Sequence, residues 1–210
     1  MDTQPQILAY IARHGRTELN HAGMFRGPLD IPLDSTGVRQ AHTLAYYFEP
    51  IEISRIVYSP RKRSTLTAQI IAKDKDVDII PNDGLYAWDV GDLAGKEKTP
   101  ETNAIIQHHL KFPNIAMPGG ESMNDFRHRI RPLLWDAVEM GDREGIPTLI
   151  VAHSSVVHEA GAMFNQSHTS TLVKPGGVAG IFIENGHLKA EPIFRPDVEG
   201  MQKGRAESMS

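Results

Sequence analysis

The sequence predicts an α/β fold, a three-layer α/β/α sandwich around a mostly parallel central sheet. First, short apolar runs with the length of buried strands alternate along the chain with longer stretches that suit helices. Second, three of these runs end directly in a polar loop, at residues 13–15, 59–60 and 153–155. Because the carboxyl ends of parallel strands meet at one edge of a sheet, where ligands gather, we expect these loops to lie close together.

The first half of the chain is expected to form three strands and two helices. Asp34 suits the N-cap of the first helix, because its carboxylate can accept the free amide hydrogens of the first turn, and Pro50 ends that helix. The second helix is expected to turn Leu66, Ile70 and Ala72 toward the sheet. In chain order we expect a strand over 7–12, a helix over 34–48, a strand over 53–58, a helix over 61–73, a strand over 77–80 and a long loop over 81–96.

The second half is expected to add three helices, one strand and a hairpin. Pro100 suits the first turn of a helix, where its missing amide hydrogen costs nothing. Pro132 is expected to kink or split the helix that contains it. Asn185 and Gly186 favour the positive φ values of a tight hairpin turn. In chain order we expect a helix from 99 that ends before 113, a helix over 122–140, a strand over 148–152, a helix over 154–164 and a hairpin of 178–184 with 187–193.

The composition indicates an ordinary globular protein. The 210 residues are expected to form one domain, with a core over about 6–195 and a polar, loose tail over 196–210. The net charge of −4 offers no basic field, so we expect neither a nucleic-acid nor a membrane partner. The absence of cysteine excludes thiolate chemistry and fits a reducing compartment. Because no apolar run reaches the length of a membrane span or a signal sequence, a cytoplasmic location is expected.

One short segment is more specific than any other. Residues 13–20 read Arg-His-Gly-Arg-Thr-Glu-Leu-Asn and match the pattern R-H-G-x-T-x-x-N. With the further matches named below, the chain resembles the histidine phosphatase superfamily, in its phosphoglycerate mutase-like branch. This resemblance covers roughly residues 7–164 and implies a phosphoglycerate mutase-like fold. The further matches are the pattern from Gly27 to Ala41, Ser59 with Arg63, Thr67 and Ala68, the segment 119–122, and the strand end Val151-Ala152-His153.

The matched residues suit phosphoryl transfer. Arg13 and Arg63 can bind a phosphomonoester dianion through planar, bidentate donors. His14 is the expected nucleophile, because a neutral imidazole near pH 7 can attack phosphorus and form a phosphohistidine that water hydrolyses. The resemblance implies that His153 stabilises the charge on the transferring oxygens. The residues expected either to bind phosphate or to hold the loop around the nucleophile are Thr17 and Asn20.

The resemblance breaks at the residue that should protonate the leaving oxygen. The family segment L-x-E-x-x-x-G-x-x-x-G carries a glutamate where this chain has Ala87. Positioned proton transfer is worth roughly 10²–10⁴ in rate. Asp89 is the hypothetical replacement, since desolvation by neighbouring aromatic rings would raise its pKa. The candidates for substrate contact are Tyr86 and Trp88, for which packing in a core or lid is the alternative, and Ser154, which stands where many relatives have glycine.

Other polar clusters are expected to have no role in chemistry. His108 and His109 are neighbours on a predicted helix and should point to different faces of it at the surface. Arg127, Arg129 and Arg131 are expected to form a solvated stretch. Because no histidines or acids have the spacing of metal ligands, neither a metal nor another cofactor is expected.

Together these observations predict a metal-independent phosphatase that acts on a small phosphorylated substrate and releases inorganic phosphate. One alternative is a phosphoglycerate-type mutase, although such mutases carry longer substrate segments and keep the glutamate. A second is a protein phosphohistidine phosphatase, which can lack the glutamate because imidazole leaves readily. A third is a non-catalytic module that holds a phosphorylated ligand. The sequence leaves the oligomeric state open.

Overall fold

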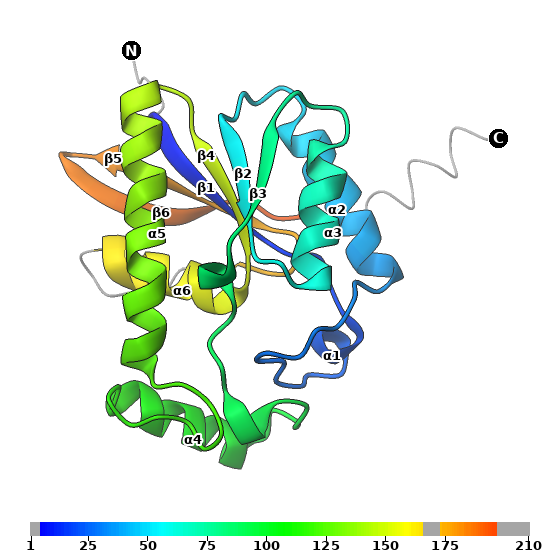
Figure 1. Cartoon of the computed structure of the whole chain (residues 1–210), viewed down its shortest axis with the longest axis vertical. Coiled ribbons are helices and arrows are strands. Elements are labelled where there is room, and N and C mark those ends of the chain that lie inside the picture. Colours follow the sequence, from blue (N-terminus) through cyan, green and yellow to red (C-terminus); the bar gives the residue numbers. More distant parts are fainter. Residues whose placement is uncertain (1–4, 166–172, 197–210) are drawn as a thin grey trace.

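A six-stranded sheet with helices on both faces forms the body of the molecule (Figure 1). The computed structural model describes residues 5–165 and 173–196. Its strands follow the order β3-β2-β4-β1-β5-β6, and only β5 runs against the others. The predicted α/β class with a mostly parallel sheet is therefore confirmed. The elements are β1 (Ile7–Arg13), α1 (Glu18–His21), α2 (Ser35–Phe48), β2 (Arg55–Tyr58), α3 (Lys62–Ala72), β3 (Asp78–Pro81), the 3₁₀ turns η1 (Asp83–Leu85) and η2 (Gly91–Leu93), α4 (Pro100–Lys111), α5 (Met123–Glu144), β4 (Thr148–Ala152), α6 (Ser154–Phe164), β5 (Val178–Glu184) and β6 (His187–Phe194).

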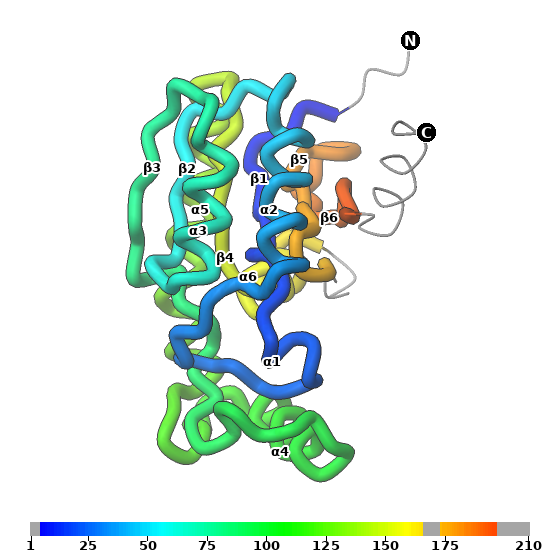
Figure 2. Tube along the Cα trace, turned by 90° about the vertical axis from the view of Figure 1, so that its right-hand side faces the viewer, coloured from blue at the N-terminus to red at the C-terminus, as the bar shows by residue number. Residues whose placement is uncertain are grey.

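The apolar alternation of the central strands separates two cores. On β1, Tyr10 packs in the core beneath α2 and α3, whereas its neighbour Ile11 packs in the core beneath α5 and α6. Leu149 and Ile150 of β4 divide in the same way. Successive strand residues point to opposite faces, so a strand that is apolar on both sides requires helices on both. This pattern explains the three-layer arrangement seen in Figures 1 and 2.

Helix α3 turns a different face to the sheet from the one predicted. Leu66 is 37% exposed, and the buried residues of the helix include Arg63, Thr67 and Ile71. The hydroxyl of Thr67 accepts a hydrogen bond from the amide of Gly15, at 3.3 Å. Hydrophobic periodicity misplaced this face because the helix directs two polar side chains into the site at the end of β1.

Of the two expected effects of Pro132, a kink or a split, the split does not occur. Helix α5 continues for 22 residues and ends beyond the expected Met140, where Gly145 adopts a left-handed conformation with φ of 69°. A proline leaves the carbonyl four residues earlier without its helical partner. Here that carbonyl belongs to His128, and both His128 and Pro132 are exposed, so water can hydrate the gap.

Two glycines let α2 approach the loop that follows β1. A Cβ atom on Gly15 would lie 2.3 Å from the carbonyl oxygen of Gly37, and a Cβ on Gly37 would lie 2.0 Å from that of Arg16. Asp34 caps the helix as predicted, and its Oδ1 accepts the amide hydrogen of Gly37 at 2.7 Å. The start of α2 thereby holds the polar loop against the sheet edge.

Substitution of Gly37 by alanine tests this close approach. The added methyl group would overlap the carbonyl of Arg16, so the free energy of unfolding should fall by about 2–3 kcal/mol. Urea denaturation measures the change. Ser35→Ala, an exposed position in the same helical turn, is the control and should change the value by less than about 0.5 kcal/mol. Equal stability of the two variants would show that the loop moves away freely.

The carboxyl ends of β1, β2 and β4 face the part of the molecule that contains α1 and α4. Figures 1 and 2 show both helices beyond this edge of the sheet. The predicted long loop contains η1 and η2 and also passes over this edge. The predicted tail over 196–210 falls almost wholly outside the described residues.

Candidate active site

His14 begins the loop after β1 and is fully buried. Its amide donates to the carbonyl of Ala152, the last residue of β4, at 3.0 Å. Its ring atom Nδ1 lies 2.6 Å from the carbonyl oxygen of Gly15. Because a carbonyl only accepts hydrogen bonds, Nδ1 carries the proton in this pair and Nε2 keeps its lone pair in the neutral ring. Nε2 has no hydrogen-bond partner, so this lone pair is available.

His153 stands beside His14 at the end of β4. The two rings meet edge to face, with centroids 5.3 Å apart. The Nε2 atom of His153 lies 2.8 Å from the hydroxyl oxygen of Ser59, which follows β2. Its Nδ1 atom is buried without a partner. Three neighbouring strand ends thus build one constellation, as the sequence predicted.

Three arginines surround the histidine pair. Arg13 donates from Nη1 to the carbonyl of Val173 at 2.8 Å, and Arg63 donates from Nη1 to that of Leu29 at 2.6 Å. The Nε atoms of Arg13 and Arg63 are buried and have no partner. Arg26, between α1 and α2, is a third cation that sequence reasoning missed. Within the part of the chain that the structure describes, no carboxylate forms an ion pair with any of these three.

Burial and the unbalanced positive charge shift the pKa values of the whole group. Burial lowers the pKa of His14 well below its usual value, and the charge of Arg63 lowers it further. The pKa of His153 falls for the same two reasons. Burial lowers the pKa of Arg13 to about 9 and that of Arg26 to about 10. Both histidines are therefore neutral, and a bound anion would relieve the repulsion among the arginines.

The neutral histidines make stability depend on pH. Below the ordinary histidine pKa of 6.5 the unfolded chain binds protons that the folded protein does not. The contribution of these histidines to the free energy of unfolding is therefore full above pH 6.5. It falls as the pH drops toward their lowered folded-state pKa values, by up to about 1.4 kcal/mol per pH unit for each histidine. Urea unfolding between about pH 7.5 and 5.5 should show this loss. His153→Gln should flatten the slope, whereas exposed His42→Gln should not; identical slopes would contradict the assignment.

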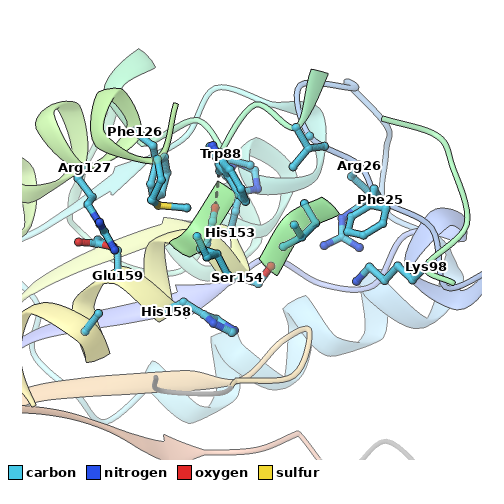
Figure 3. Close-up of a pocket in the computed structure, with 18 of the residues that line it drawn as sticks. Phe25, Arg26, Trp88, Lys98, Phe126, Arg127, His153, Ser154, His158 and Glu159 are labelled. Carbon is cyan, nitrogen blue, oxygen red and sulfur yellow. Dashed lines mark hydrogen bonds and ion pairs between the residues drawn. The ribbon is translucent and has the colours of Figure 1, made fainter. Parts of the chain in front are cut away.

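A cavity of about 570 Å³ opens above this group. Arg63 and His153 line it. His14 is not among the lining residues, but its ring contacts that of His153 edge to face. Figure 3 shows Arg26 and Lys98 at one end of the cavity. Phe25 lies with them. The other large apolar side chains of the lining are Trp88, Val90, Ile106, Leu110, Met123 and Phe126.

Thr17 and Asn20 hold the loop that follows His14. Thr17 caps the short helix α1, and its hydroxyl donates to Oδ1 of Asn20 at 3.0 Å. The amide of Asn20 donates in turn to the hydroxyl of Thr17 at 3.3 Å. Thr17 is fully buried. The sequence left two roles open for these residues, phosphate binding and support of the loop. This reciprocal cap supports the second role.

The predicted substrate contacts divide between the cavity and its outer wall. Trp88 and Ser154 line the cavity. Trp88 is held by a hydrogen bond from Nε1 to the carbonyl of Glu121, at 3.2 Å. Tyr86 is not among the lining residues; its hydroxyl donates to Asp83, and the guanidinium of Arg61 lies 4.2 Å from its ring centroid.

Asp89 also lies outside the cavity lining, in contrast to Ala87, which is part of it. The Oδ1 atom of Asp89 accepts the amide hydrogen of Gly91 at 2.9 Å. Gly91 has a φ of 50°, and a Cβ there would lie 2.0 Å from the carbonyl of Pro118. The carboxylate of Asp89 thus stabilises a tight turn, and the structure does not bring it to the other site residues. The position of the family glutamate presents only a methyl group.

The three arginines expected to be solvated are structural, so that expectation was wrong. Arg129 donates to the carbonyl oxygens of Gly84, Tyr86 and Ala87 and pairs with Glu121. Arg129 therefore holds the loop that carries Ala87 and Trp88.

Arg127 and Arg131 instead pair with the buried carboxylate of Glu159. Their spacing of four on one helix face was a signal for a shared acidic partner. His109, expected at the surface, is buried, and its Nδ1 lies 3.0 Å from the carbonyl oxygen of Ile115.

Two further structural findings concern the described residues only. Histidine and acidic side chains form no group of three or more that could hold a metal ion among them. None of their helices combines the length and apolar character that crossing a bilayer requires.

The fold and the site together define an α/β protein in which histidines and arginines gather at the carboxyl ends of parallel strands. The chain belongs to the histidine phosphatase superfamily, and the family's branch 1 matches residues 9–172. The resemblance seen in the sequence is thereby confirmed.

The relatives include both phosphatases and mutases. The uncharacterized phosphatase PhoE of Bacillus subtilis (strain 168) is 30% identical over 148 residues, which are 70% of this chain and 72% of that protein. A 2,3-bisphosphoglycerate-dependent phosphoglycerate mutase of Cytophaga hutchinsonii is 29% identical over 152 residues, 69% of this chain and 71% of that one. The crystal structure of a phosphoglycerate mutase from Bacillus anthracis str. Sterne has a TM-score of 0.75 at 21% identity and covers 98% of this chain and 100% of its own. The expected phosphoglycerate mutase-like fold is confirmed.

Proposed function

We propose that this protein is a metal-independent phosphatase that hydrolyses small phosphomonoesters through a phosphohistidine on His14. The observation that carries the proposal is the partnerless Nε2 of a buried, neutral His14 beside arginines that form no ion pair within the described residues. An unprotonated imidazole is a competent nucleophile. Positively charged side chains around it allow a phosphate dianion to approach. The relatives named above, phosphatases and mutases, support the same class of reaction.

The phosphate would occupy the space between the two histidines and the arginines. Arg13 and Arg63 each offer a free Nε–H, and Arg26 adds a third positive charge. Nε2 of His14 attacks phosphorus as the bond to the leaving oxygen breaks. His153 faces the same space with its free Nδ1 and can stabilise the equatorial oxygens. Water then attacks the phosphohistidine, the P–N bond breaks, and inorganic phosphate leaves.

Hydrolysis is favoured over mutase chemistry by the lining of the cavity. A mutase must bind and reorient an intermediate with several anionic groups. Away from the phosphate site this cavity presents mainly apolar side chains. Its further cations are Lys98, which lies at the end that holds Arg26, and Arg127, which already pairs with Glu159. A phosphomonoester with one anionic end suits this lining better.

The release of inorganic phosphate from p-nitrophenyl phosphate in EDTA tests the proposal. This aryl ester needs little help in leaving, so it reports on the nucleophile and the phosphate site alone. Turnover that is unaffected by EDTA is expected. Binding of inorganic phosphate without any turnover would refute the catalytic proposal and favour a module that holds a phosphorylated ligand.

A further inference from the structure

The geometry points to the class of phosphomonoester that this site takes: an ester of phosphate with an acidic, phenol- or enol-type hydroxyl carried by a flat apolar group. This inference rests on the proposed phosphatase function and narrows its substrate. Two independent observations carry it. One is the absence of a proton donor over the leaving oxygen, and the other is the apolar lining of the cavity.

The first observation concerns the groups that could protonate a leaving oxygen. Ala87 lines the cavity with a methyl group, and Asp89 lies outside the lining. The only carboxylate among the lining residues is that of Glu159, which binds Arg127 and Arg131 and is an acceptor in both pairs.

The histidines of the cavity are also poor acids. His153 is held neutral by burial and by the arginines, which lower its pKa. The pKa of His158 is lowered too, first by burial and then by the charges of Arg13 and Lys98. Both are therefore neutral imidazoles near pH 7, and a neutral imidazole is a weak proton donor. Lys98 is the other lining group that could give up a proton, and it lies with Arg26 at one end of the cavity, away from His153 (Figure 3). A leaving oxygen beside His153 therefore departs as an anion.

Departure as an anion selects the leaving group. The lone pair of His14 Nε2 forms the P–N bond, and the pair of the breaking P–O bond goes with the leaving oxygen. That oxygen takes its proton from bulk water after release. Water later attacks phosphorus, gives up one proton to solvent and returns the P–N electron pair to Nε2. The sum is ester plus water to alcohol plus phosphate, and its first step is fast only when the conjugate acid of the leaving group is acidic, as a phenol is with a pKa of about 10.

The second observation is where the charge and the apolar surface lie in the cavity. Arg26 and Lys98 lie together at one end, whereas Trp88 and Phe126 lie over and beside His153 (Figure 3). Ile106 and Leu110 of helix α4 also line the cavity. Near His153 the cavity thus forms a slot bounded by aromatic rings, and aliphatic side chains complete its lining.

The size and lining of this slot suit a flat ring. A cavity of about 570 Å³ is large enough for a bicyclic group. A small polar leaving group, such as that of phosphoserine, would leave most of this apolar surface in contact with water. Burying a ring there gains the free energy of the hydrophobic effect and places the ester oxygen at the histidines.

The test measures kcat/KM for a matched series of esters with purified protein in EDTA. Phenyl and benzyl phosphate carry the same ring but differ in the acidity of the alcohol that leaves. The kcat/KM of phenyl phosphate should exceed that of benzyl phosphate by about 10³-fold or more. An enzyme with a working general acid would show a ratio that is smaller by a factor of roughly 10²–10⁴. 1-Naphthyl phosphate, with a second fused ring, should exceed phenyl phosphate by about 10-fold or more. Phosphoserine should be the poorest of the series.

Three variants separate the two parts of the inference. Ala87→Glu introduces a carboxyl group at the position of the family glutamate. It should raise kcat/KM for benzyl phosphate by about 10²-fold or more and change kcat/KM for phenyl phosphate by less than about 10-fold. Leu110→Gln should reduce the naphthyl-to-phenyl ratio. Its control is Ile105→Gln, on the same helix and similarly exposed at 41% against 39% but outside the lining, which should leave that ratio unchanged.

The possible outcomes distinguish failure of the inference from failure of the proposed function. Absence of turnover with p-nitrophenyl phosphate would refute the phosphatase itself. Equal kcat/KM for benzyl and phenyl phosphate, or an equal gain for both in Ala87→Glu, would overturn the claim about the leaving group. Naphthyl phosphate no better than phenyl, or phosphoserine as good as either, would overturn the claim about the apolar slot. The predicted order with the predicted changes in the variants would support both.

Discussion

Replacement of His14 by alanine should abolish hydrolysis of p-nitrophenyl phosphate. The contact of His14 Nδ1 with the carbonyl oxygen of Gly15 leaves the lone pair on Nε2, which is buried and has no hydrogen-bond partner. Without it there is no atom to form the covalent intermediate, and water alone would have to attack the ester. We expect kcat to fall by about 10⁴-fold or more, the scale seen when other covalent enzymes lose their nucleophile.

The same variant should still bind phosphate, because the arginines remain. Isothermal titration with inorganic phosphate checks this and shows at the same time that the protein is folded. His42→Ala changes an exposed histidine of α2 and should keep full activity. More than about one tenth of wild-type turnover in His14→Ala would remove His14 from the role of nucleophile.

Arg63→Gln is expected to have the second largest effect. The Arg63 side chain is 1% exposed, its Nη1 is occupied by the carbonyl of Leu29, and its Nε has no partner. Removal of the charge takes away a donor that is already oriented and dehydrated, so kcat/KM for p-nitrophenyl phosphate should fall by about 10²–10³-fold. Arg63→Lys should recover only part of this loss, since an ammonium group lacks the planar fork of the guanidinium.

The control for this substitution lies one residue away. The Lys62 side chain is 67% exposed, and its Nζ forms only a long ion pair, 4.0 Å, with a carboxylate oxygen of Asp30. Such an exposed pair contributes little, so Lys62→Gln should change kcat/KM by less than about 2-fold. Circular dichroism and the thermal midpoint of each variant show whether the fold is kept. A folded Arg63→Gln with wild-type kcat/KM would mean that Arg63 serves only to hold the loop at Leu29.

The regular elements were predictable because their causes are local. Strand β4 has the bounds expected from its apolar run, and α2 begins after Asp34 because that carboxylate accepts an amide hydrogen of the first turn. The inward face of α3 was not predictable in this way. Its buried side includes Arg63 and Thr67, whose partners lie on other segments of the chain. Hydrophobic periodicity contains no information about such partners.

The central site residues were named from the sequence, and the peripheral ones were not. The motif around His14 identified the loop, and the strand ends identified Arg63 and His153. Arg26 has no motif and lies in irregular chain, so only its position beside Arg13 reveals it. Asp89 was expected to act as an acid because of its aromatic neighbours, but the fold uses it to hold the turn at Gly91.

The sequence by itself determined the family, the α/β class and the identity of the nucleophile candidate, because each depends on residue types at fixed spacing along the chain. Only the tertiary structure decided which tautomer His14 adopts, which arginines form no ion pair, and which side chains line the cavity. Each of these depends on contacts between segments that are far apart in sequence, such as Arg129 with the loop that carries Ala87. Desolvation and hydrogen bonding act through distance in space, and the fold alone sets that distance.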